Sequence, residues 1–164
     1  MSAPLLVADS GPLIALARLD LLGIPSRLFG ELLVTATVWR EVTSEPRPAD
    51  QVALSAAFDR RLLLVVEDPL QIPAALAEVQ IDEGERSALA LALLRDAVVL
   101  VDERRGRACA LGLGLSVLGT LGLLVRAREQ GMVNRVRPLT DALLASGYFL
   151  ARPLVDRTLA SIGE

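Results

Sequence analysis

The stretch LLVADSGP, residues 5–12, joins a short apolar run to an aspartate and a glycine–proline pair. Leu5–Ala8 is apolar at every position instead of alternating with polar residues, which is typical of a strand buried on both faces of a parallel sheet. Runs of the same character recur at Leu32–Thr35, Leu62–Val66, Val98–Val101 and, more weakly, Leu115–Leu118. We therefore predict a central parallel sheet of four to five strands.

Helical patterns separate and follow these strands. They are Leu13–Leu19, Val38–Val42, Gln51–Arg60, Glu83–Arg95, Arg104–Leu111, Leu121–Gln130, Leu139–Ser146 and Leu154–Ile162. Alternating strands and helices predict an α/β fold, here a three-layer α/β/α sandwich. We expect a single domain over residues 1–164, with its core at about 5–130 and C-terminal helices at about 131–164. The loop Thr43–Asp50, with its two prolines, is too short to divide two domains.

Three absences in the composition limit the chemistry. Because the chain has no His, catalytic Ser-His-Asp triads and histidine zinc sites are excluded. All 17 basic residues are Arg, so phosphate loops and Schiff-base sites that depend on Lys are excluded as well. The single Cys109 can form neither an internal disulfide nor a zinc cluster, and we interpret it as a core thiol. Carboxylates, hydroxyls and arginines remain for catalysis.

The uncharged segment Ala108–Val125 is long enough to raise the question of a membrane span. Its four glycines instead indicate a helix end, a short strand and a new helix. The N-terminus lacks the basic start of a signal peptide, so we expect a cytoplasmic protein that does not enter a membrane. A net charge of −3 is unusual for a general nucleic-acid binder, although metal-binding carboxylates would themselves add negative charge.

Two aspartates directly follow predicted strands. Asp9 comes after Leu5–Ala8, and Asp102 comes after Val98–Val101. In open parallel sheets, ligands bind beyond the carboxyl ends of the strands, where the strand order reverses. Both carboxylates would share this edge if their strands are neighbours. Structural roles are the alternative: Asp102 could cap the following helix, and Asp9 could shape a turn.

Two glutamates lie on segments next to the same edge. Glu41 is found in the stretch TVWREV, residues 37–42, and Glu85 in IDEGERSALA, residues 81–90. Asp82 and Glu85 also have the spacing of a capping box, which is a purely structural explanation for Glu85. Glu41 could equally be a solvated helix residue.

Five motifs in order provide a resemblance to a known family. They are DSGPLIAL at 9–16, VWREV at 38–42, GERSALALA at 84–92, LVDERRGR at 100–107 and LGTLGLL at 118–124. This succession, over about residues 5–130, resembles PIN-domain proteins, and looks closest to an uncharacterised branch related to VapC-type toxin ribonucleases. The resemblance implies the PIN α/β/α sandwich, metal-dependent phosphodiester cleavage and an acidic quartet at Asp9, Glu41, Glu85 and Asp102. The toxin branch more often carries Asp where Glu85 stands.

The chemistry of four neighbouring carboxylates is consistent with this resemblance. Like charges raise each other's pKa, and a divalent cation would relieve the repulsion. Ligands made only of oxygen favour Mg²⁺ or Mn²⁺. We predict metal ligation by Asp9, Asp102 and Glu85, with Glu41 as a ligand through water or as an orienting group. The metal would lower the pKa of a bound water, since no histidine is present to act as the base.

Substrate phosphates need hydrogen-bond donors near the carboxylates. The candidates are Ser10, Arg104, Arg105, Arg107 and Thr120. The alternatives are a solvated helix start for the arginines and a helix cap for Thr120. A second basic group, Arg126, Arg128, Arg135 and Arg137, is interpreted as a solvated face. Trp39 is interpreted as a core or interface residue.

The leading hypothesis is a nuclease that hydrolyses phosphodiester bonds in single-stranded RNA, and it could be the toxin of a toxin–antitoxin pair. The resemblance implies a small antitoxin protein as the partner, with an amphipathic helix in a groove of the nuclease. The alternative is a catalytically inactive PIN-like module that binds protein or nucleic acid. A receiver-like phosphorylation domain ranks lower because it lacks the usual Lys. A homodimer is also expected, with Leu154–Ile162 as a candidate interface.

Overall fold

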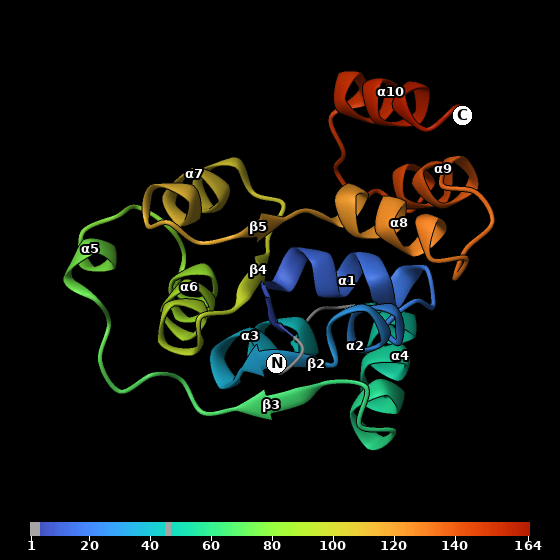
Figure 1. Ribbon diagram of the computed structural model, residues 1–164. Helices are drawn as coiled ribbons and strands as arrows, with labels where there is room; N and C mark the ends of the chain where they lie inside the picture. Colours follow the sequence, from blue (N-terminus) through green and yellow to red (C-terminus); the bar gives the residue numbers. More distant parts are fainter. Residues whose placement is uncertain (1–3, 45–46) are drawn as a thin grey trace.

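A computed structural model describes residues 4–44 and 47–164 of the chain, and a five-stranded parallel sheet lies at its centre (Figure 1). The strands are β1 (Leu5–Ala8), β2 (Glu31–Thr35), β3 (Leu64–Val66), β4 (Val98–Leu100) and β5 (Val117–Leu118). They lie in the order β3-β2-β1-β4-β5. The sheet and its flanking helices confirm the predicted α/β/α sandwich.

The strand order reverses at β1. The chain moves outward on one side from β1 to β2 and β3, then returns to place β4 against the other side of β1. Val7 pairs in register with Leu33 of β2 and Val99 of β4. Asp9, just past β1, continues this pairing by donating its backbone N–H to Leu100 O at 3.0 Å. The carboxyl ends of β1 and β4 are therefore neighbours, as ligand binding at a strand-order reversal requires.

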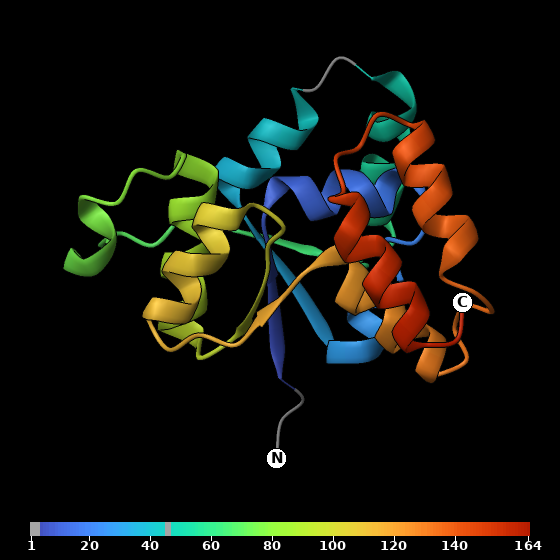
Figure 2. The same cartoon turned by 90° about the horizontal axis from the view of Figure 1, so that it is seen from above.

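Helices cover both faces of the sheet (Figures 1 and 2). Their bounds are α1 (Ser10–Arg18), α2 (Ile24–Phe29), α3 (Ala36–Thr43), α4 (Pro48–Asp59), α5 (Ala74–Ala77), α6 (Glu83–Arg95), α7 (Arg104–Gly112), α8 (Thr120–Glu129), α9 (Arg137–Ala145) and α10 (Arg152–Ser161). In both views α6 and α7 lie on one side of the strands, and α1, α2 and α8 lie on the other. The main core consists mostly of Leu, Val, Ile and Ala from the strands and the helices around them, with Phe29 of α2.

The C-terminal helices α9 and α10 pack on the outside of α1 and α8 through a second apolar cluster. Its buried members are Ala15, Leu121, Leu124, Val136, Leu143, Leu150, Val155 and Leu159. Figure 2 shows α9 and α10 next to α1 and α8, on the side of the molecule away from α6. The C-terminal part is thus attached next to α1, the helix that directly follows Asp9.

Element boundaries differ from the predicted ones where the local pattern is short. β3 begins at Leu64 rather than Leu62, and β5 contains only Val117 and Leu118. The helices α2 and α5 were not predicted, because six and four residues are too few to show a helical period. α4 begins inside the predicted loop, where Pro48 occupies the first turn, a position that proline favours. Residues 45 and 46 of that loop lie outside the described residues.

The apolar segment Ala108–Val125 is divided among α7, β5 and α8, as its glycines predicted. Gly114 has a φ of +77°, a conformation that favours glycine, and it ends the turn between α7 and β5. Among the described residues, no helix combines the length and the apolar character that a membrane crossing needs.

Candidate active site

Asp9 lies at the centre of the sheet edge, between the end of β1 and the start of α1. The residue is only 7% exposed, and its side chain forms no cap hydrogen bond with α1 although Asp9 occupies the N-cap position. Its Oδ1 atom is buried without a hydrogen-bond partner. Burial raises the pKa of Asp9 from 3.8 to about 7, and the negative charges of Glu85, Asp82 and Glu41 add to this rise. The Ser10 backbone N–H opposes it.

Glu41 reaches the same edge from α3. Its Oε2 atom accepts a hydrogen bond of 2.5 Å from the Ser10 hydroxyl, which links α3 to the start of α1. The carboxylate also lies against Gly84 of α6, where an added Cβ would collide with it. Glu41 therefore does not behave as a solvated helix residue. The glycine allows α3 and α6 to approach closely enough for this carboxylate to fit between them.

The two carboxylate oxygens of Glu85 have different environments at the start of α6. Its backbone N–H donates to Asp82 Oδ1 at 2.7 Å, and its Oε2 accepts the Asp82 N–H at 3.4 Å, so the capping box is present. Its Oε1 is buried without a partner, and the residue is only 4% exposed. Burial and the charge of Asp82 raise the pKa of Glu85. One oxygen therefore caps the helix while the other remains available.

Asp102 follows β4 and does not cap the adjacent helix α7, because the N-cap position of α7 is Glu103. Its Oδ1 accepts the Thr120 backbone N–H at 2.7 Å. Its Oδ2 accepts two hydroxyl groups at 2.5 Å each, one from Thr120 and one from Tyr148. The carboxylate is thus held by α8 and by the connection between α9 and α10. We call Asp9, Glu41, Glu85 and Asp102 the acidic site.

Sequence reasoning missed Tyr148 and three glycines at the acidic site. Added Cβ atoms at Gly106 and Gly119 would stand 2.5 Å from Glu85 Oε1 and 3.1 Å from Asp102 Oδ1, respectively. Gly84 provides the same clearance for Glu41. A possible signal was that Gly84, Gly106 and Gly119 all lie within the quoted motifs, next to or near the acids. Nothing local pointed to Tyr148, which is 46 residues away from Asp102.

The predicted phosphate-binding residues have different environments. Arg104 and Arg105 are exposed at the start of α7. Arg107 donates its Nη1 to Val101 O at 3.0 Å, and its guanidinium lies against Gly119, as the Asp102 carboxylate does. The Ser10 hydroxyl is donated to Glu41.

Thr120 is fully buried and donates its hydroxyl to Asp102, and its contact with substrate stays a prediction. Its alternative role as a helix cap is wrong, since the N-cap of α8 is Gly119 and makes no side-chain cap bond. The hydroxyl instead orients a carboxylate of the acidic site.

Other residues named in the sequence analysis make contacts with the rest of the protein. Arg128 and Arg135 form ion pairs with Glu164 at 3.0 and 3.7 Å, and Arg126 lies over the Phe29 ring. The Trp39 ring packs against the core and stacks on Phe58 with ring centroids 5.4 Å apart. Cys109 is partly buried against the core, in agreement with a structural thiol.

The donor chemistry of the acidic site fits Mg²⁺ or Mn²⁺. Every side-chain ligand candidate is an oxygen, and Asp9 and Glu85 each have a buried oxygen that lacks a partner. Within residues 4–44 and 47–164, however, no group of three or more Asp, Glu or Cys side chains is placed to hold a metal ion together. Ser10 holds Glu41, and Thr120 and Tyr148 hold Asp102. Joint ligation by all four acids stays a prediction.

Comparisons with known proteins agree with this architecture. A family described as a PIN domain matches residues 5–164. The chain is similar to a PilT N-terminus domain protein from Sulfolobus solfataricus, with 15% identity and a TM-score of 0.60 over 75% of this chain and 92% of that one. It is also similar to a protein from Pyrobaculum aerophilum, with 23% identity and a TM-score of 0.52 over 77% and 97%. These likenesses show the fold. No curated protein matches the chain at a significant level.

Proposed function

Because this chain belongs to the PIN-domain family, we propose that it is a metal-dependent nuclease that hydrolyses phosphodiester bonds in single-stranded RNA. The observation that carries the proposal is the pair of unpartnered buried oxygens, Asp9 Oδ1 and Glu85 Oε1, at the strand-order reversal. Unpaired buried carboxylate oxygens are costly, and they persist where a ligand or a proton can satisfy them. The pKa of Asp9, raised to about 7 by burial and by the neighbouring acids, is typical of a functional position.

Each residue of the acidic site would either bind the metal ion or orient a water. Asp9 and Glu85 would bind a Mg²⁺ or Mn²⁺ ion through their free oxygens, and Asp102 through Oδ1. Glu41, held by Ser10, would orient a water or bind through one. A divalent cation bound there would lower the pKa of a bound water, so that the water could lose its proton to solvent and attack phosphorus as hydroxide at neutral pH. Asp9 would release its proton as the cation takes its place.

Exposed arginines next to the acidic site support a phosphate substrate. Arg104 and Arg105 extend from the first turn of α7, two and three residues after Asp102. A guanidinium can donate two hydrogen bonds to one phosphate group. These arginines would hold the chain of the nucleic acid while the neighbouring carboxylates act on the bond to be cut. Arg107, which bonds to Val101 O, would contribute mainly through its charge.

The proposed function includes a regulatory partner. A toxin-like nuclease would be paired with a small antitoxin protein that blocks the acidic site or the approach to it. A homodimer is also part of the proposal. Co-expression with the neighbouring reading frame, followed by purification and measurement of molar mass, would test both.

Cleavage of a labelled single-stranded RNA tests the proposal directly. Wild-type protein with Mn²⁺ or Mg²⁺ is expected to cut the RNA, and Asp9→Asn is expected to abolish cutting. Asp96→Asn is the matched control: it removes a carboxylate from an exposed residue after α6 with a φ of +50°, which asparagine tolerates. Equal activity of wild type and Asp9→Asn under both metals would refute the nuclease proposal.

A catalytically inactive PIN-like binding module is the second candidate. It is favoured by the hydrogen bonds that already occupy Glu41 and Asp102, and by the lack of three converging ligands among the described residues. Calorimetric titration with Mn²⁺ separates the two candidates. Binding that Asp9→Asn abolishes supports the nuclease, whereas no binding at millimolar Mn²⁺ supports the inactive module.

A further inference from the structure

The connection between α9 and α10 brings the only tyrosine of the chain to the acidic site. The Tyr148 hydroxyl donates a hydrogen bond to Asp102 Oδ2. It also lies next to the first turn of α1, since a Cβ added at Gly11 would stand 3.2 Å from it. Tyr148 therefore stands between Asp102 and the start of the helix that follows Asp9.

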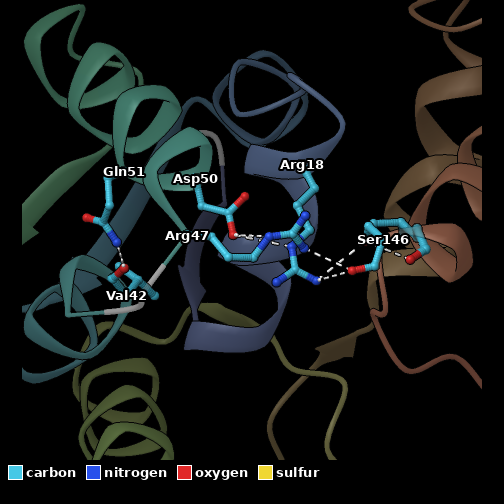
Figure 3. A network of polar contacts seen from close by, with 7 residues as sticks. Arg18, Val42, Arg47, Asp50, Gln51 and Ser146 are labelled. Atoms are coloured by element: carbon cyan, nitrogen blue, oxygen red, sulfur yellow. Dashed lines mark hydrogen bonds and ion pairs between the residues drawn. The ribbon is translucent and has the colours of Figure 1, made fainter.

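An ionic network centred on the buried Asp50 holds this connection in place (Figure 3). Asp50 of α4 is only 3% exposed. Its Oδ2 atom forms ion pairs with Arg18 Nε at 3.3 Å and with Arg47 Nε at 3.9 Å. Both arginines also donate to the Ser146 carbonyl oxygen, at 3.4 Å from Arg18 and 2.9 Å from Arg47. Ser146 is two residues before Tyr148, so α1 and α4 restrain the segment that carries the phenol.

The hydrogen bonds of Asp102 leave one oxygen available. Oδ2 accepts both the Thr120 and the Tyr148 hydroxyls, which fill its two lone pairs. Oδ1 accepts only the Thr120 N–H among the hydrogen bonds of the described residues, so it has one lone pair left. Removal of the phenol hydroxyl would free one lone pair of Oδ2 and leave the carboxylate held by Thr120 alone, through its hydroxyl and its N–H, so that its orientation would be less restrained.

We propose that Tyr148 is a positioning residue of the acidic site, which fixes the Asp102 carboxylate so that Oδ1 is presented to a divalent cation. The Arg18–Asp50–Arg47 network would set the position of Tyr148 through Ser146. This inference rests on the proposed metal site and deepens it. Hydrogen-bond partners of metal ligands orient them, and their loss commonly weakens metal affinity or activity by roughly 10- to 100-fold.

The affinity of the Tyr148→Phe variant for Mn²⁺ tests the inference, because this substitution removes only the hydroxyl. We expect the dissociation constant for Mn²⁺ to rise by roughly 10- to 100-fold. In a cleavage assay, the Mn²⁺ concentration for half-maximal rate should rise while the KM for RNA stays unchanged. Phe149→Leu is the control, since Phe149 is 84% exposed, and it should bind Mn²⁺ as wild type does.

A double-mutant comparison separates positioning from a merely structural role. If Tyr148 acts through Asp102, then Tyr148→Phe should weaken Mn²⁺ binding in wild type but have no further effect in Asp102→Asn. Equal Mn²⁺ affinities of wild type and Tyr148→Phe, or additive effects in the double mutant, would overturn the inference. Wild-type protein that binds Mn²⁺ without cutting RNA would refute only the nuclease. Absence of Mn²⁺ binding would overturn both proposals.

Discussion

Gly106 lies directly against the carboxylate of Glu85: a Cβ at residue 106 would stand 2.5 Å from Glu85 Oε1 and 3.1 Å from Val101 Cγ2. Real Cβ atoms do not approach an oxygen so closely, so any larger residue at 106 must displace the glutamate or the strand end. The displaced atom is the unpartnered oxygen that we assign to the cation. The glycine is therefore part of the acidic site although it has no side chain.

Gly106→Ala should impair Mn²⁺ binding, because the added methyl group pushes Glu85 Oε1 out of position. Gly112→Ala is the matched control: it lies on the same helix α7 with open space around its Cβ position. Alanine favours a helix over glycine by up to about 1 kcal/mol, so Gly112→Ala should be neutral or slightly stabilising. Calorimetry and thermal unfolding of the two variants provide the measurement. Equal Mn²⁺ affinities would show that Glu85 Oε1 is not a ligand.

Two substitutions, Glu85→Gln and Asp82→Ala, should distinguish the helix-capping role of Glu85 from its proposed role as a metal ligand. Asp82→Ala removes the side chain that accepts the Glu85 N–H, and should cost about 1 kcal/mol of stability while Mn²⁺ binding persists. Glu85→Gln removes the charge but keeps an amide that can bond to the Asp82 N–H, so stability should change little while Mn²⁺ binding is lost. Urea unfolding and Mn²⁺ titration measure the two effects. If Glu85→Gln lowered the stability but left Mn²⁺ binding unchanged, Glu85 would act only as part of the helix cap.

Without divalent metal, the free energy of unfolding should decrease as the pH rises from about 4 to about 7. Asp9 binds its proton more tightly in the folded protein, where burial raises its pKa to about 7, than in the unfolded chain at 3.8. Protonation therefore stabilises the fold at low pH, and this contribution is lost as the pH passes through the folded pKa. At about 1.4 kcal/mol for each pKa unit, the loss could reach about 4 kcal/mol.

Unfolding by urea at several pH values, with and without Mn²⁺, measures this dependence. Asp9→Asn should flatten most of the pH profile, and the raised pKa of Glu85 should account for a remaining slope of the same sign. Mn²⁺ should restore stability at pH 7, since the cation binds the ionised carboxylates. A wild-type profile that rises between pH 4 and 7 in the absence of metal would contradict the assigned cause.

Arg18→Gln should destabilise the protein much more than Arg47→Gln. The Arg18 side chain is 15% exposed and forms the shorter ion pair with the buried Asp50, whereas Arg47 is 45% exposed. Removing one partner of a buried ion pair costs about 3 kcal/mol or more, but an exposed pair contributes under about 1 kcal/mol. Urea unfolding measures both, with the exposed Arg157→Gln as the control. Similar losses for the two variants would contradict a network centred on Asp50.

The amino-acid sequence by itself determined the layers of the fold and the positions of Asp9 and Asp102 at strand ends. Strands buried on both faces must be apolar throughout, so β1, β2 and β4 are recognisable from short runs of residues. Asp9 and Asp102 could be placed at strand ends for the same reason, and the capping box of Asp82 and Glu85 was readable because its partners are three residues apart. Each of these features depends on local periodicity or local spacing.

Only the tertiary structure decided how the carboxylates are held. The bond from Tyr148 to Asp102 and the contacts of Glu41 with Ser10 and Gly84 join residues that are tens of positions apart. No periodic pattern encodes such contacts, because they arise where the strand order reverses and where helices pack on one another. The burial of Thr120 and its bond to Asp102 likewise depend on how the start of α8 meets the end of β4.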